Sequence, residues 1–239
     1  MEPQNQVNDV NKTFFELFKQ IEDHLGVSES EYFMDNFRQS AVKDKRLRKF
    51  ERTIDVLRKL RNLEAHEANT SGYYEVAAAS IDTLRLILSY IASPQRAYDV
   101  CVKEGSIYKV DIKANIHETI AVMAEKNFSY VPVYSGKELI GVFSGDVLLT
   151  IFSFNREADF NSNTTFEFLK PFLALDKHLN EAFEFVKRDV LLSDIERDFI
   201  ASFEKPQNLV VAFITENGLP NETIIGMITQ WDLIVNEEK

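Results

Sequence analysis

The chain has 239 residues, 45% hydrophobic and 12% aromatic, which is enough for a packed core in one or two domains and argues against global disorder. The single cysteine, Cys101, excludes an internal disulfide and argues against a cysteine-type zinc cluster, and the four histidines show no metal-ligand spacing, so we predict no metal site. The sequence contains no apolar run of the roughly 18 residues that a membrane helix needs, and its N-terminus has no apolar signal core. We therefore expect a soluble protein of a reducing cytoplasm.

Basic residues concentrate in one segment of an otherwise acidic chain. The net charge is −11, but residues 38–61 hold ten of the 27 basic residues and only three acidic ones. The net charge alone disfavours nucleic acid as a partner, whereas a local basic stripe can still bind phosphates. The alternative is a solvated helix face that binds nothing.

The first part of the chain predicts helices. Apolar residues recur at helical spacing from Phe14 to Leu25, and Gly26 ends this pattern. Ser28 and Glu31 have the spacing of a capping box for the next helix.

A basic helix over roughly residues 43–68 and a further helix over about 73–91 follow, separated by "NTSG" and ended at Ser93-Pro94. Four helices with short connections predict a small four-helix bundle over residues 1–95.

From about residue 105 the hydrophobic period changes, and the elements follow the order β-α-β-β-α. The strands are "IYKVDI", "YVPVY" and "LIGVFS"; the helices are "NIHETIAVMAEKN", which Asn115 and Glu118 cap, and "GDVLLTIF". The fold class is therefore α+β with two domains.

The same order then recurs, with copy one at about 103–153 and copy two at about 166–238. In copy two we predict a strand at "FLALD", a helix at "HLNEAFEFVKRDV", strands at "LVVAFI" and "IIGMIT" and a helix at "QWDLIV". Matching Glu118 with Glu181 then leaves 17 extra residues in copy two, the 191–207 segment. The two copies are expected to pack together, because each alone exposes an apolar sheet face.

The segments "NFSYVPVYSGKELIGVFS" and "ENGLPNETIIGMITQWDL" resemble a tandem CBS domain pair over about 103–239. The family's signature, Gly-hydrophobic-hydrophobic-Thr-x-x-Asp, is intact in copy two as Gly226, Thr229 and Asp232. The resemblance implies a cleft for an adenosine compound such as AMP, ADP, ATP or S-adenosylmethionine, with Thr229 on phosphate and Asp232 on ribose. Free amides at a helix N-terminus also suit phosphate. The alternative is that Thr229 is only a helix N-cap and Asp232 a first-turn residue.

Copy one departs from this signature. It has Ser144 at the threonine position, but Asp146 falls one position early, about 100° away around a helix. We therefore expect one good nucleotide site, with Ser144 and Asp146 as weaker ligand candidates.

Arg61 occupies a position on the apolar stripe of the basic helix, and His66 follows it in "RNLEAH". Within a helical domain this Arg-x4-His pattern resembles the HEPN family, in which it marks many metal-independent ribonucleases. The resemblance implies a catalytic set of Arg61, Asn62 and His66 that requires no cofactor. Histidine suits proton transfer and arginine suits a developing phosphorane charge. The basic stripe would contact RNA through Lys45, Arg48, Lys49 and Arg52.

Residues five apart lie about 140° apart around a helix, so Arg61 and His66 do not face each other within one chain. The resemblance implies that the motifs of two chains meet in a homodimer, and CBS pairs also tend to dimerise. The alternative is structural: Arg61 pairs with Glu22 or Glu64, and His66 stabilises the helix end.

Two functions remain open on the sequence. The first is a nucleotide-gated ribonuclease. The second is a non-enzymatic nucleotide sensor whose helical domain serves dimerisation or partner docking, and an unregulated helical scaffold is the least favoured.

Overall fold

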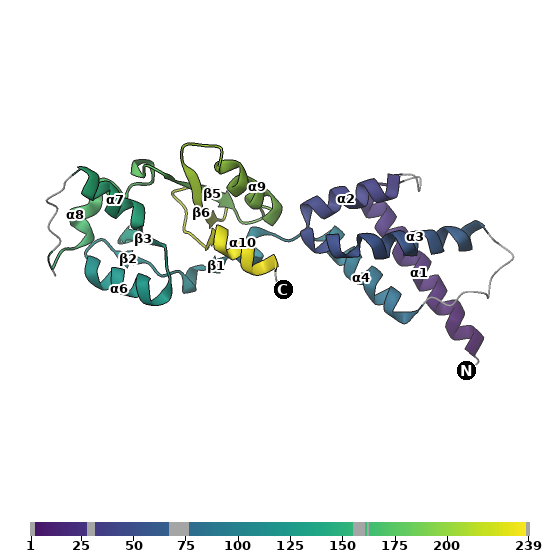
Figure 1. Ribbon diagram of the computed structural model, residues 1–239. Coiled ribbons are helices and arrows are strands. Elements are labelled where there is room, and N and C mark those ends of the chain that lie inside the picture. Colours follow the sequence, from purple (N-terminus) through teal and green to yellow (C-terminus); the bar gives the residue numbers. More distant parts are fainter. Residues whose placement is uncertain (1–2, 28–31, 67–76, 155–160, 162, 238–239) are drawn as a thin grey trace. The chain divides into compact units, whose positions relative to one another are not determined.

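The chain forms two compact units. The computed structural model describes residues 3–27, 32–66, 77–154, 161 and 163–237. Unit 1 comprises Met1–Gln95 with Leu191–Ser193, and unit 2 comprises Arg96–Val190 with Asp194–Lys239 (Figure 1). Within the described residues, no helix is both long and apolar enough to cross a membrane.

Unit 1 is helical around a core rich in phenylalanine. Its described elements are α1 (Pro3–Leu25), α2 (Phe33–Lys43), the 3-10 helix η2 (Lys45–Phe50), α3 (Glu51–His66) and α4 (Ala78–Ala92). The first helix ends at Gly26 as predicted, and Phe18 from this helix stacks on Phe33 of α2 with ring centroids 5.2 Å apart. The predicted cap at Ser28 and Glu31 and the "NTSG" break lie outside the described residues.

The predicted basic helix over 43–68 is confirmed in part, because residues 51–66 form α3 whereas residues 45–50 form a 3-10 helix. Helix α2 ends at Lys43, and the buried Asp44 separates it from η2, which leads into α3. The Asp44 carboxylate accepts hydrogen bonds from the backbone N–H groups of Arg46 and Gln95, at 3.0 and 3.1 Å, and from the Arg46 guanidinium. A short acidic side chain that bonds nearby backbone groups competes with a continuous helix, which explains the break.

Copy one of the repeat has the predicted order. It consists of β2 (Val110–Asp111), α6 (Ile116–Lys126), β3 (Tyr130–Ser135), β4 (Glu138–Ser144) and α7 (Gly145–Phe154). Strand β2 pairs parallel to β3 across the α6 crossover, and β3 pairs antiparallel to β4. The Asn115 side chain caps α6 by accepting from the Glu118 N–H at 3.1 Å, as predicted.

Copy two has the same order, but two of its predicted elements are wrong. Its elements are β5 (Glu181–Lys187), α9 (Leu192–Ser202), β6 (Asn208–Thr215), β7 (Gly226–Thr229) and α10 (Gln230–Glu237). The predicted strand "FLALD" lies across α8 (Phe166–Leu173) and the 3-10 helix η4 (Leu175–Lys177), and the predicted helix "HLNEAFEFVKRDV" contains strand β5.

The crossover helix of copy two is therefore α9, which lies in the 191–207 segment. That segment is part of the repeat and not an insertion. Glu181 begins a strand, so its predicted equivalence with Glu118 of helix α6 is also wrong.

The segment before copy one packs against β7, and the segment before copy two packs against β4. After α5 (Ala97–Val100), β1 (Val102–Lys103) pairs antiparallel with β7, giving the sheet order β1-β7-β6-β5. A Cβ on Gly226 of β7 would lie 2.5 Å from Cys101 Sγ, and one on Gly141 of β4 would overlap the Leu173 carbonyl. Both glycines are thus required by the close approach of a neighbouring segment.

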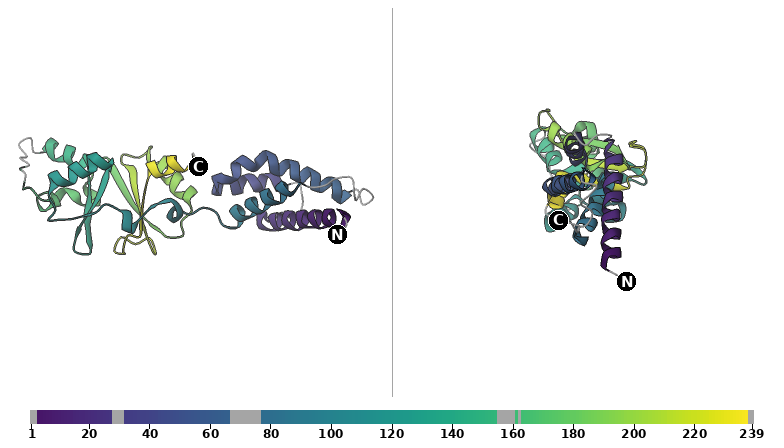
Figure 2. Two further views of the ribbon diagram at one scale, coloured as in Figure 1. Left: turned by 90° about the horizontal axis from the view of Figure 1, so that it is seen from below. Right: turned by 90° about the vertical axis from the view of Figure 1, so that its right-hand side faces the viewer.

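The two sheets of unit 2 share a core, as predicted for the two copies. Val142 of β4 packs in one cluster with Val211 and Phe213 of β6, whereas the next residue, Phe143, packs with α6, α7 and α8. This alternation follows from the two-residue period of a strand. The helices of copy one consequently gather over one face of its sheet (Figure 2).

Candidate ligand-binding site

The three signature residues of copy two come together where β7 passes into α10. Thr229 ends the strand and Asp232 lies in the first turn of the helix. The Asp232 carboxylate accepts hydrogen bonds from the Thr229 backbone N–H at 2.7 Å and from the Thr229 hydroxyl at 2.9 Å. Both side chains are half-buried, so this polar pair also stabilises the start of the helix.

The thiol of Cys101 lies beside this junction, next to Gly226. Burial raises the pKa of Cys101, the nearby Asp232 charge adds to this, and Lys103 opposes it. A raised pKa keeps the thiol protonated at neutral pH, which argues against a nucleophilic role.

The corresponding junction of copy one is occupied by side chains from the beginning of copy two. The Ser144 hydroxyl donates to Glu181 Oε2 at 2.6 Å. Asp146 accepts from the Leu179 N–H at 3.2 Å and from the Asn180 side-chain amide at 2.8 Å. The two weaker ligand candidates are thus held by residues 179–181.

A buried histidine, which the sequence analysis did not select, joins this group. His178 Nδ1 lies 2.8 Å from Glu181 Oε2, and the ring packs edge-on against Phe183. The His178 side chain is fully buried, and its Nε2 has no hydrogen-bond partner among the described residues. Burial raises the pKa of Tyr130 to about 12, and the negative charges of Glu181 and Asp146 contribute.

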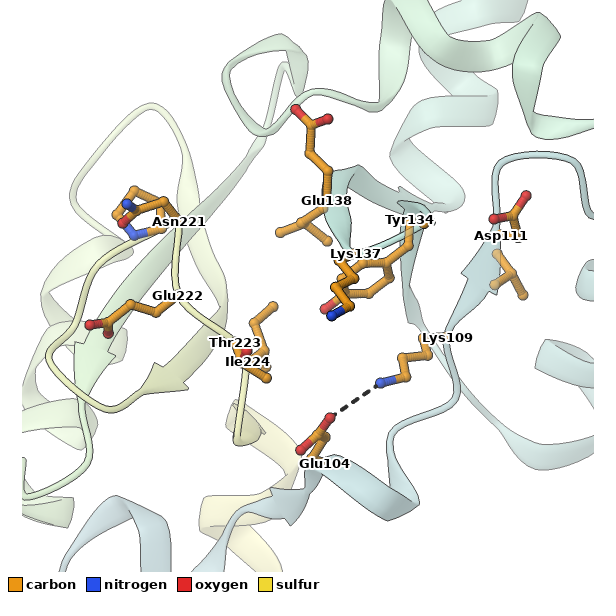
Figure 3. Close-up of a pocket in the computed structure, with 14 residues that line it drawn as sticks. Glu104, Lys109, Asp111, Tyr134, Lys137, Glu138, Asn221, Glu222, Thr223 and Ile224 are labelled. Carbon is orange, nitrogen blue, oxygen red and sulfur yellow. Dashed lines mark ion pairs between the residues drawn. The ribbon is translucent and has the colours of Figure 1, made fainter.

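A pocket of about 1010 Å³ lies elsewhere in unit 2, between the β3–β4 turn and the loop before β7 (Figure 3). Its charged side chains include Lys109, which lies 3.6 Å from Glu104, and Lys137 at the turn. None of the five predicted ligand residues lines this pocket.

In unit 1, Arg61 is paired. Its guanidinium donates to Glu22 Oε2 at 2.8 Å and to Asn62 Oδ1 at 3.1 Å, and it lies 5.9 Å from the centroid of the Phe18 ring. The Arg61 side chain keeps 29% of its surface exposed and that of Glu22 13%. The side chain of His66 lies outside the described residues.

The predicted RNA contacts do not lie on one continuous helix. Lys45, Arg48 and Lys49 are on η2, whereas Arg52 is in the first turn of α3. Arg48, Lys49 and Arg52 are exposed, and Lys45 is half-buried. The ammonium of Lys49 lies 5.3 Å from the centroid of the Phe50 ring.

Comparison with known proteins identifies a CBS domain in residues 99–152, which match the family model of that description. The comparison with curated proteins gave no match. Among solved structures, the chain is similar to a hemolysin-like protein containing a CBS domain from Oenococcus oeni, with 16% identity, coverage of 62% of this chain and 93% of that one, and a TM-score of 0.41.

Two further similar structures were solved with nucleotides. One is CBSX2 in complex with AMP, with 14% identity, coverage of 60% and 97%, and a TM-score of 0.42. The other is the CBS domain of a bacterial CNNM/CorC family Mg²⁺ transporter in complex with ATP, with 14% identity, coverage of 59% and 86%, and a TM-score of 0.41.

Proposed function

We propose that the protein is a regulatory sensor that binds an adenine nucleotide at the β7–α10 junction of its C-terminal unit. The observation that carries the proposal is the pairing of Thr229 with Asp232 at the start of a helix, directly after Gly226. Gly226, Thr229 and Asp232 resemble the ligand signature of the CBS family, and residues 99–152, in copy one, match the family model.

The chemistry of the junction suits a nucleotide. The Thr229 hydroxyl and the first amides of α10 can donate to phosphate oxygens, and the Asp232 carboxylate can accept from ribose hydroxyls. A bound nucleotide would compete for the hydrogen bonds that Asp232 now accepts from Thr229. The junction of copy one is less suitable for phosphate because the Glu181 carboxylate lies against Ser144.

Calorimetric titration of the full chain with AMP, ADP, ATP and S-adenosylmethionine tests this proposal. We expect one site per chain, and we expect Asp232→Asn to weaken binding by at least about tenfold, because a hydrogen bond to a charged group contributes about 1.5–3 kcal/mol. Ser144→Ala is the matched control in copy one. Equal affinity in Asp232→Asn and the wild type would refute the assignment.

The second candidate is a metal-independent endoribonuclease in unit 1, acting as a homodimer that the nucleotide controls. The favouring observation is a basic surface: Arg48 and Arg52 are exposed, and no ion pair of either one is present among the described residues. The Glu22–Arg61 ion pair favours the structural alternative, in which unit 1 serves dimerisation or docking.

Incubation with a mixed RNA pool in EDTA, with and without ATP, separates the two candidates. Cleavage by the wild type and not by His66→Ala would establish the nuclease, and an ATP effect would couple it to unit 2. Light scattering of the purified chain measures whether it is the expected dimer. If a dimer forms and no RNA is cut, the sensor with a docking module remains.

A further inference from the structure

A group of metal-ligating side chains lies at the junction between the two copies in unit 2. Asp146 comes from the first turn of α7, His178 from the segment after η4, and Glu181 from the start of β5. Each offers a ligand atom, and these atoms all lie within 4.8 Å of one another. The Ser144 hydroxyl is 2.6 Å from Glu181 and supplies a fourth donor atom beside them.

Among the described residues, histidine is the basic side chain beside the two carboxylates, and neither lysine nor arginine balances their charges. Glu181 receives hydrogen bonds only from Ser144 and His178, and Asp146 only from Leu179 and Asn180, as far as the described residues extend. Over the same residues, neither carboxylate forms an ion pair with lysine or arginine. Both carboxylates are half-buried, so part of their hydration is lost, and a cation would offset that cost.

The imidazole of His178 supplies the nitrogen donor of the group. The residue is 3% exposed, and its ring is held in place by Glu181 on Nδ1 and by the Phe183 ring. Its Nδ1 is the ring nitrogen that faces Glu181, whereas Nε2, across the ring, has no partner among the described residues. A metal ion bound at Nδ1 would replace the His178–Glu181 hydrogen bond and neutralise the two carboxylates together.

We propose that Asp146, His178 and Glu181 bind a divalent first-row transition metal ion, with zinc as the representative. One imidazole and two carboxylates form a donor set that zinc takes, whereas magnesium and calcium prefer oxygen ligands alone. With zinc bonds of about 2.0–2.2 Å, the ligand atoms of a tetrahedral site lie about 3.4 Å from one another. The three ligand atoms here lie within 4.8 Å of one another, so small side-chain movements would bring them all onto one ion.

The ion would connect the two copies. Asp146 belongs to copy one, whereas His178 and Glu181 precede and begin the first strand of copy two. The ion would therefore fix the β4–α7 junction against β5 and stabilise the folded unit in proportion to ln(1 + [metal]/Kd). This proposal does not depend on nucleotide binding at the β7–α10 junction.

The proposal is tested by calorimetric titration of the full chain with zinc. The protein is first stripped of metal with EDTA and transferred to a chelator-free buffer. We expect one saturable ion per chain and a higher Tm with zinc. Glu181→Gln and Asp146→Asn should each weaken binding by at least about 100-fold, since even residues that only orient metal ligands contribute about 10–100-fold. Glu138→Gln removes an exposed carboxylate at the far end of β4 and should leave the affinity unchanged.

Cobalt absorption gives a readout that does not depend on the variants. Co²⁺ bound through imidazole nitrogen and carboxylate oxygen should show ligand-field bands on the wild-type chain that zinc then displaces. Failure of the wild type to bind one ion saturably overturns the proposal, whether or not the variants fold. Equal affinity in Glu181→Gln and Glu138→Gln, with metal-free circular dichroism spectra like the wild type, would overturn it too.

Discussion

Breaking the Glu22–Arg61 pair should destabilise unit 1. The two side chains join α1 to α3 through a 2.8 Å contact and retain only 13% and 29% exposure. Fully exposed pairs contribute about 0.2–1 kcal/mol, and removing one partner of a buried pair costs about 3–5 kcal/mol. For a partly exposed pair we expect Glu22→Gln to lower the free energy of unfolding by about 1–2 kcal/mol.

A double-mutant cycle isolates the interaction. Arg61→Met keeps the aliphatic stem and removes the charge, so the coupling in Glu22→Gln/Arg61→Met should be about 1 kcal/mol. Far-UV circular dichroism during urea unfolding follows the helices of both units, and the transition that Glu22→Gln shifts is the one that belongs to unit 1. The matched control is Lys12–Glu16, an exposed pair at 3.9 Å whose coupling should not exceed about 0.5 kcal/mol.

The result also bears on the ribonuclease candidate. A coupling no larger than that of the control pair would refute the structural role of Arg61 and leave its guanidinium available to a phosphate. A coupling near 1 kcal/mol supports the alternative in which Arg61 is tolerated on an apolar stripe because it is paired.

Three other perturbations test the fold. Gly226→Ala should destabilise unit 2 by about 1–3 kcal/mol because the added Cβ would lie 2.5 Å from Cys101 Sγ. Gly105→Ala is the control and should be nearly neutral, because nothing lies within 4 Å of its added Cβ. The fluorescence of the single tryptophan during urea unfolding compares the two variants. Asp44→Ala should lower the free energy of unfolding of unit 1 by about 2–4 kcal/mol, measured by circular dichroism, because it leaves buried backbone donors unpaired. The pKa of Tyr130 is raised to about 12, so the folded state holds the phenolic proton more tightly than the unfolded chain does. The free energy of unfolding should therefore fall as the pH rises from about 10 towards 12. This loss should be smaller in Tyr130→Phe.

Copy one was predictable because its local signals agree with its fold. Asn115 caps α6 as its spacing indicates, and the alternation in "YVPVY" and "LIGVFS" matches a strand pair. In copy two the first strand was missed, although Phe183 and Phe185 alternate with Glu184 in the manner of a strand. The helix α9 also had its own signal, because Leu192, Ile195 and Phe199 recur at spacings of three and four. The predicted helix at "HLNEAFEFVKRDV" and the predicted extra segment 191–207 conflict with these two periodicities.

The candidate metal group could not be predicted from spacing. His178 and Glu181 are three residues apart, but Asp146 lies 32 residues before His178 and reaches the group only through the packing of α7 beside the start of β5. A search for local ligand motifs detects neighbours along one element and does not detect sites assembled between repeats. The break between α2 and η2 likewise involves a distant partner, since the Asp44 carboxylate accepts from the Gln95 backbone N–H, 51 residues away.

The two junctions have diverged although the repeat gives them the same framework. Ser144 and Thr229 each follow a glycine by three residues and end the last strand of their copy. In copy two the hydroxyl bonds the carboxylate of its own helix, so the polar atoms remain at the junction for a ligand. In copy one the hydroxyl bonds Glu181 instead, and a histidine fills the adjacent space. The same framework thus pairs the junction hydroxyl with Asp232 in copy two and with Glu181 in copy one, and the proposals of a nucleotide at one junction and a metal ion at the other rest on this difference.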